Sequence, residues 1–446
     1  LVVSIISSKK GLKEAQDTLY IPWKSKKIRQ INKLKGHVVS AIAWSQRNSS
    51  ESRTGPFICG TKHGELFELE LSSEESYFQS GHELYCKSLF NSFGDSDEIA
   101  GVQILPCPAN DLEYVIMCNT KARFYQFKGT LKSVDSRPLF SDLFTQYKGE
   151  NSNFFEYKGS NKSSFLKLYH QPSTLMASSV AWSNGHGVLH GVINWSKSSD
   201  DILDEVKVMK ITRDSGSSQI LSHVGTGLVL TPFHLLIPHD NEVSVVCTIS
   251  EKVLMNERIP GDSCKARGIT QDTVKGTIWL YSERAIFKCK MDREDRNIWN
   301  MYLDQGKFEL AKKYCHGDQL KLLCVRMKEA MALFDLGDYV KSAKLFAHTT
   351  TPFEQVFLKL NSVDAEDGLR VYLLEKLATL GEDEQGQISL IILVMLEYYF
   401  NRLGRVREGT DESKEEWIKI NKEFDDNTKR EVDGVSLDPR KNGASD

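Results

Sequence analysis

Residues 1 to about 290 alternate between apolar and polar positions in short runs. Each run is rich in β-branched and aromatic residues and ends at Gly, Asn, Ser or Asp. This pattern predicts short antiparallel strands. The clearest hairpin pairs a strand at 57–60 with a strand at 65–71 through a turn at 61–64. Strict alternation along 65–71 predicts that Leu66, Glu68 and Glu70 lie on one face of that strand, with Phe67, Leu69 and Leu71 on the other.

Four similar hairpins follow, at 114–127, 180–193, 233–247 and 276–289. Their spacing of roughly 45 to 65 residues is typical of four-stranded blades with loop insertions. The sequence therefore predicts an all-β propeller over 1–290, because a β-sandwich rarely needs so many residues. A short helix near 138–147 is the one helical pattern expected among the strands.

The opening of the chain suggests an irregular propeller. Residues 35–44 have the Gly-His rhythm of a WD40 blade, yet the chain contains no Trp-Asp dipeptide. We therefore expect a degenerate propeller. The chain starts at Leu1 without Met, so the first blade is expected to be truncated at its N-terminus.

After Met291 the apolar positions recur with helical periodicity. Residues 302–315 are followed 31 positions later by a similar stretch at 333–346, and both contain Asp-x-Gly, then an aromatic residue, then Ala. The matched residues are Asp304 and Asp335, Gly306 and Gly337, Phe308 and Tyr339, and Ala311 and Ala343. Gly suits the left-handed end of a helix, and Ala suits a close approach of two helices. The repeat predicts an α-solenoid of helical hairpins, resembling clathrin-heavy-chain repeats, over 291–404.

About seven helices are expected in this region. Gly306, Gly337, Gly381 and Gly404 are expected to end helices, Pro352 to start one and Asp364 to cap one. The spacing of six aromatic residues predicts that they pack in the solenoid core: Trp299, Tyr302, Phe308, Tyr314, Phe334 and Tyr339. The tail, 405–446, is highly charged. Trp417, Ile420 and Phe424 predict one more amphipathic helix there, and the residues beyond Val432 are expected to be disordered.

Composition narrows the functional classes. The 57 basic and 60 acidic residues give a net charge of −3, which offers no basic surface for nucleic acid. Nine scattered cysteines without a CxxC motif indicate reduced, mostly buried thiols. The apolar run at 388–400 is too short to span a bilayer and contains Glu397, so it fits a buried helix.

Candidate chemistry is sparse. The chain has no phosphate-binding loop, dinucleotide fingerprint, nucleophile elbow or HExxH motif. His186 and His190 form HxxxH, but in a strand these side chains lie too far apart to share a zinc ion. Cys107 and Cys118 lack the paired spacing of a zinc site. No catalytic, cofactor-binding or metal-binding residue is predicted, and an enzyme in a propeller channel would need converging His, Asp or Glu side chains.

One basic segment, 23–37, stands out. It could attract acidic lipid headgroups or an acidic protein, but a solvated edge of the first blade is the favoured interpretation.

Several stretches, in order from about 35 to about 404, resemble the vacuolar protein sorting-associated protein 18 family, known in flies as deep orange. They include SRTGPFICGTKHGELFELEL, EVSVVCTI, GTIWLYSERAIFKC, IWNMYLDQGKFELAKKYC and YVKSAKLFAHTTTPFEQVFLKL. A family member of full length continues into a longer solenoid and a cysteine-rich RING domain. This chain contains no such domain, so no zinc site or ubiquitin-ligase activity is expected for it.

The resemblance implies a non-enzymatic core subunit of the HOPS and CORVET membrane-tethering complexes. The implied location is the cytosolic face of late endosomes and lysosomes or vacuoles, with early endosomes as a further site. The implied partners are the other class C subunits, including a Sec1/Munc18-type protein, and indirectly SNAREs and Rab GTPases. The alternative is a coat-like or nuclear-pore-type propeller–solenoid that self-assembles on membranes.

Overall fold

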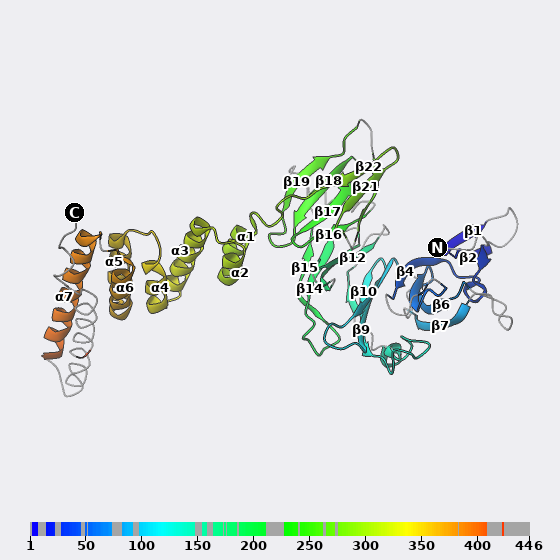
Figure 1. Cartoon of the computed structure of the whole chain (residues 1–446), viewed down its shortest axis with the longest axis horizontal. Coiled ribbons are helices and arrows are strands. Elements are labelled where there is room, and N and C mark those ends of the chain that lie inside the picture. Colours follow the sequence, from blue (N-terminus) through cyan, green and yellow to red (C-terminus); the bar gives the residue numbers. More distant parts are fainter. Residues whose placement is uncertain are drawn as a thin grey trace, which may run out of the picture. The chain divides into compact units, whose positions relative to one another are not determined.

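The computed structural model divides the chain into two compact units, Leu1–Glu294 and Asp295–Asp446. The structure describes all residues except 1, 8–14, 23–27, 46–49, 51, 74–82, 92–97, 148–153, 158–163, 173, 175, 185–186, 211–226, 240, 262–264, 273–274, 382, 408–421 and 423–446. Strands fill the first unit and helices the second (Figure 1).

The described part of the first unit contains six antiparallel sheets, in which neighbouring strands are also neighbours in sequence. The first three sheets comprise β1 (Val2–Ser7), β2 (Ala15–Tyr20) and β3 (Arg29–Gln30); β4 (Val39–Trp44), β5 (Phe57–Thr61), β6 (Glu65–Leu71) and β7 (Glu83–Asn91); and β8 (Gly101–Pro106), β9 (Glu113–Asn119), β10 (Arg123–Thr130) and β11 (Phe154–Glu156). The other three comprise β12 (Phe165–His170), β13 (Ala177–Ser183), β14 (Val188–Ile193) and β15 (Leu203–Met209); β16 (Val229–Leu230), β17 (His234–His239), β18 (Glu242–Cys247) and β19 (Val253–Arg258); and β20 (Ala266–Gln271), β21 (Ile278–Ser282) and β22 (Ile286–Cys289).

All five predicted hairpins are confirmed by the pairing of β5 with β6, β9 with β10, β13 with β14, β17 with β18, and β21 with β22. The first strands of successive sheets contact one another, from β4 to β8, β12, β16 and β20. This is the arrangement of propeller blades, in which the first strand of each sheet is innermost. The helix expected at 138–147 is a 3-10 helix, Leu143–Tyr147.

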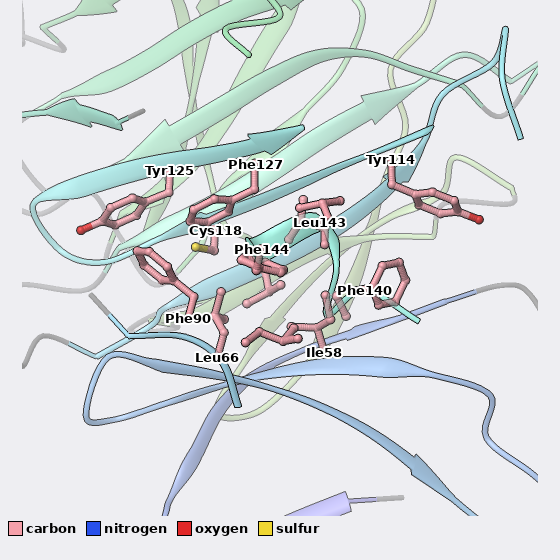
Figure 2. Close-up of a cluster of buried hydrophobic side chains, with 14 of the residues drawn as sticks. Ile58, Leu66, Phe90, Tyr114, Cys118, Tyr125, Phe127, Phe140, Leu143 and Phe144 are labelled. Atoms are coloured by element: carbon pink, nitrogen blue, oxygen red, sulfur yellow. The ribbon is translucent and has the colours of Figure 1, made fainter. Parts of the chain in front are cut away.

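The hydrophobic clusters of this unit lie between one sheet and the next, as blades require. In the largest cluster, Leu66 and Phe90 of the second sheet face Tyr125 and Phe127 of the third (Figure 2). The ring centroids of Phe90 and Phe127 are 4.8 Å apart. The 3-10 helix adds Phe144, whose ring lies 4.8 Å from that of Phe127. The segment between β10 and β11 therefore completes the contact between these two blades.

A buried carboxylate holds that segment in place. Glu68 of β6 is fully buried and accepts hydrogen bonds from the backbone N–H groups of Leu139 and Phe140, at 2.5 and 2.9 Å. The Tyr85 hydroxyl donates a third hydrogen bond at 2.7 Å. Beside it, Glu70 pairs with Arg137 at 2.8 Å. Glu68 and Glu70, which were predicted to share one face of β6, thus both anchor the segment that precedes the 3-10 helix.

A second carboxylate lies where the first unit ends. Glu294 Oε1 accepts hydrogen bonds from the Thr231 hydroxyl at 2.5 Å and from the Phe233 N–H at 3.1 Å. It also lies 2.9 Å from Nδ1 of His234, at the start of β17. After the last strand, β22, the side chain of Glu294 therefore attaches the chain to the turn between β16 and β17.

The described part of the second unit contains seven helices: α1 (Ile298–Asp304), α2 (Phe308–Lys313), α3 (Gln319–Asp335), α4 (Tyr339–Ala347), α5 (Phe353–Asn361), α6 (Glu366–Thr379) and α7 (Gln385–Arg407). Gly306 and Gly337 follow α1 and α3 with φ of 71° and 84°, which L-residues rarely adopt. Ala311 and Ala343 are fully buried, as a close approach of helices requires. The repeated pattern of Gly and Ala therefore forms the two helix–Gly–helix corners that the sequence predicted.

Two predicted helix ends are wrong. Helix α7 runs through Gly404 to Arg407, because nothing at Gly404 forces the left-handed conformation that ends a helix. Asp364 has φ of 50° and does not cap α6. The cap position is Ala365, whose side chain makes no capping hydrogen bond.

The six aromatic residues predicted for the solenoid core are half-buried and not fully enclosed. Trp299, Tyr302 and Phe308 pack against the small cluster around Ala311, and Phe334 and Tyr339 pack against the larger cluster around Ala343. The rings of Phe334 and Tyr339 are 5.1 Å apart.

Candidate interaction sites

The described residues contain no group of three or more His, Cys, Asp and Glu side chains that could hold a metal ion. His190 is buried in β14, and burial lowers its pKa to about 4. His186 lies outside the described residues. Cys107 and Cys118 are both buried, and burial raises the pKa of the Cys118 thiol.

The cysteines divide by burial as the sequence predicted. Cys324 is exposed and Cys264 falls outside the described residues. Five are buried: Cys59, Cys107, Cys118, Cys247 and Cys315. Cys86 and Cys289 are half-buried.

Only part of the basic segment at 23–37 belongs to the described residues, from Ile28 onward. There β3 forms the edge of the first sheet, and Ile31 and Leu34 are buried beneath it. Lys33 and Lys35 are exposed. The burial of Ile31 and Leu34 explains the position of this stretch, and Lys33 and Lys35 are exposed to solvent.

A groove of about 750 Å³ lies at the second helical corner. One wall is the stretch 336–340, which ends α3 and starts α4, and the other is 364–368, which starts α6. The walls approach closely because Gly368 packs on Tyr339: a Cβ at Gly368 would lie 3.0 Å from the Cβ of Tyr339 and 3.1 Å from its carbonyl oxygen. A side chain at position 368 would force α4 and α6 apart.

The groove combines apolar and acidic side chains. Leu336 is 81% exposed and Val340 is 39% exposed, although both line it. Four carboxylates surround them: Asp338, Asp364, Glu366 and Asp367. The described residues that line the groove include no lysine or arginine.

Helix ends account for part of this acidity. Asp338 caps α4, accepting from the Lys341 N–H at 3.2 Å and pairing with the Lys341 ammonium at 2.7 Å. These hydrogen bonds lower the pKa of Asp338. Glu366 and Asp367 lie in the first turn of α6, where the helix dipole favours a negative charge. Asp364 has no such role, and its carboxylate is exposed.

The repeat supplies a comparison for the apolar residues. Thirty-one positions earlier, the first corner has Gln305 where the second has Leu336, and Glu309 where the second has Val340. Both corners nonetheless form the same helix–Gly–helix structure. The fold therefore does not require an apolar residue at either position. The sequence alone contained this signal, but only the structure shows that the two residues border one groove.

A second cavity, of about 110 Å³, lies in the first unit between the first strands of four successive sheets. It is lined by residues of β8, β12, β16 and β20: Gln103, Lys167, Leu168, His170, Val229, Leu230 and Gln271. No pattern in the sequence indicates that these side chains converge, because their strands are separated by long stretches of chain.

Blades arranged around shared first strands, followed by stacked helical hairpins, define a propeller–solenoid protein. Residues 3–291 match the Pep3/Vps18/deep orange beta-propeller domain, and residues 295–440 match the first half of the VPS18 alpha-solenoid domain. The chain belongs to this Pep3/Vps18/deep orange family, as its sequence predicted. The match reaches residue 440, beyond residue 404 where the resemblance was expected to end.

Several relatives support the assignment. The chain is 30% identical to a vacuolar protein sorting-associated protein 18 homolog of Danio rerio, over 92% of this chain and 42% of that protein. It is 27% identical to vacuolar sorting protein 18 of Arabidopsis thaliana, over 87% of this chain and 39% of that protein. It is 25% identical to vacuolar membrane protein pep3 of Schizosaccharomyces pombe, over 85% of this chain and 40% of that protein. The chain thus spans about two-fifths of the length of these curated relatives.

Among the helices that the structure describes, none combines the length and the apolar character needed to cross a bilayer.

Proposed function

We propose that this chain acts in vacuolar protein sorting as part of a non-enzymatic core subunit of a HOPS- or CORVET-type tethering complex. The observation that carries the proposal is that both units match, in order, the propeller and the solenoid of one family whose relatives are named for vacuolar sorting. The proposed location is the cytosolic face of late endosomes and lysosomes or vacuoles. The proposed partners are the other class C subunits, including a Sec1/Munc18-type protein, and through them SNAREs and Rab GTPases.

The groove at the second corner provides a docking surface for this role. Its exposed Leu336 and Val340 offer apolar contact, and its four carboxylates offer negative charge. The complementary occupant is an amphipathic segment of a partner subunit that carries an apolar side chain beside lysine or arginine. Apolar contact supplies most of the affinity at such sites, while charge complementarity supplies orientation and selectivity.

A variant that copies the first corner tests this surface. Leu336→Gln with Val340→Glu gives the second corner the residues of Gln305 and Glu309, with which the same turn already folds. The purified chain and the variant are mixed with cytosol, and captured subunits are identified by crosslinking and mass spectrometry. We expect wild type to capture tethering subunits and the variant to capture at least one of them about tenfold less well.

Leu358→Gln is the matched control, because Leu358 is 64% exposed on α5 and does not line the groove. It is expected to bind as wild type does. If a folded wild-type chain captured no tethering subunit, the proposed function would be wrong. If the double variant captured every subunit as well as wild type, the function would stand and the groove would not be the docking surface.

A self-assembling coat is a second candidate, because two edge strands carry exposed apolar residues. Leu254 and Met255 on β19 are 46% and 48% exposed, and Ile286 on β22 is 72% exposed. Such edges favour strand pairing between copies. An apparent molar mass, measured by light scattering, that rises with the concentration of the purified chain would favour the coat. A constant monomer mass would favour the tethering subunit.

A further inference from the structure

The cavity between the first strands contains a cation without a counterion. Lys167 of β12 is partly buried there, and its ammonium group makes no hydrogen bond or ion pair with any described residue. None of the seven described residues that line the cavity is acidic. Burial lowers the pKa of Lys167, because a desolvated ammonium group is unfavourable without a negative partner. A buried charge of this kind calls for a partner in the same space.

Three further polar side chains face the same space. The side chains of His170 of β12 and Gln103 of β8 likewise have no hydrogen-bond partner among the described residues. Gln271 of β20 has one long contact, from its amide nitrogen to the carbonyl oxygen of Gly276 at 3.5 Å. Amide groups and a neutral imidazole can each donate a hydrogen bond to an oxyanion. The cavity therefore provides one positive charge and several uncommitted donors.

A local irregularity brings two of these side chains together. In a regular strand, side chains at positions 167 and 170 point to opposite faces. The pairing of β12 with β13 shifts register between Tyr169 and His170, and both Lys167 and His170 line the cavity. Such bulges commonly redirect a side chain beside a functional site.

The size of the cavity limits the occupant. A single water needs about 10–15 Å³ by the same measure, so about 110 Å³ holds several waters or one phosphate-sized group. The apolar part of the wall, formed by Leu168, Val229 and Leu230, offers no further charge.

We propose that this cavity binds a phosphate-sized oxyanion, with Lys167 as its charge partner and Gln103, His170 and Gln271 as hydrogen-bond donors. The oxyanion is either free phosphate or the phosphate of a lipid headgroup. The site is independent of the docking groove and of the proposed tethering role.

The test measures occupancy at Lys167 itself. The purified 446-residue chain is treated with a lysine-acylating reagent in increasing inorganic phosphate at constant ionic strength, and acylation of each lysine is followed by mass spectrometry. We expect phosphate to slow the acylation of Lys167 at least fivefold in a saturable manner. Acylation of Lys132, which is 76% exposed, is expected to remain unchanged.

Thermal unfolding of variants gives an independent measurement. Inorganic phosphate is expected to raise the unfolding temperature of wild type and of the control Lys132→Met, but not that of Lys167→Met. His170→Gln is expected to keep a weaker response. Lys167→Met removes an unpaired, desolvated charge, so this variant is expected to fold at least as well as wild type.

The source of the phosphate is decided by co-sedimentation with phosphatidylcholine vesicles that do or do not contain phosphatidic acid. Binding that needs phosphatidic acid and Lys167 assigns the site to a lipid headgroup. Protection by inorganic phosphate without such binding assigns it to the free anion. The proposal is overturned if phosphate and phosphatidic acid both leave Lys167 acylation unchanged, or if Lys167→Met responds to phosphate as wild type does.

Discussion

The two units differ in the polar side chains that they bury. The propeller unit buries ionisable groups, among them Glu68, His190 and His234. Among the described residues of the helical unit, the buried polar side chains are Ser342 and Thr349, and neither carries a carboxylate or an imidazole. Loops between strands offer unpaired N–H groups that a buried carboxylate can satisfy, whereas helices satisfy their own backbone. A buried carboxylate in the first unit therefore has a structural role, whereas the described helices of the second unit contain no buried carboxylate.

The largest expected effect is at Glu68. Glu68→Ala leaves two buried N–H groups, those of Leu139 and Phe140, without an acceptor. We expect a loss of about 3–5 kcal/mol in the free energy of unfolding, measured by urea denaturation of the chain. Glu68→Gln keeps one acceptor oxygen and is expected to lose less. A change below about 1 kcal/mol for Glu68→Ala would show that the anchor is dispensable and would break the contrast between the units.

A pH-dependent effect is expected at His190. Its pKa is about 4 in the folded chain and near 6.5 when exposed, so the folded state binds fewer protons between these values. Stability from this residue is complete above pH 6.5 and is lost as the pH falls toward 4, by up to about 3 kcal/mol. His190→Gln is expected to flatten this part of the pH–stability curve. His63→Gln, at an exposed position, is the control and is expected to leave the curve unchanged.

Two glycines in the helical unit are expected to respond with opposite sign. Gly368→Ala places a methyl group 3.1 Å from the carbonyl oxygen of Tyr339, and we expect a loss of about 1–2 kcal/mol. Gly404→Ala lies inside α7 with open space around it, and we expect a gain of about 0.5–1 kcal/mol. Thermal unfolding of the two variants checks both values. Destabilisation by Gly404→Ala would mean that the helix ends there after all.

The sequence was sufficient wherever structure depends on nearby residues. The five hairpins and the corners at Gly306 and Gly337 follow from alternation and from the need for positive φ. The burial of Glu68 could not be predicted, because its donors lie 71 and 72 residues further along the chain. The cavity around Lys167 could not be predicted either, because the residues that line it come from strands that are far apart in the sequence. The wrong helix end at Gly404 shows that Gly permits the left-handed conformation without imposing it.

Glu294 has a mechanical consequence. The chain leaves the propeller from β22, an edge strand that a pulling force could peel from β21 one hydrogen bond at a time. Tension applied from the helical side meets Glu294 first, and its contacts with the Thr231 hydroxyl, the Phe233 N–H and the His234 ring must break together. In the proposed tethering role, a load on the chain would thus reach these three contacts before it reached the hydrogen bonds of the edge strand.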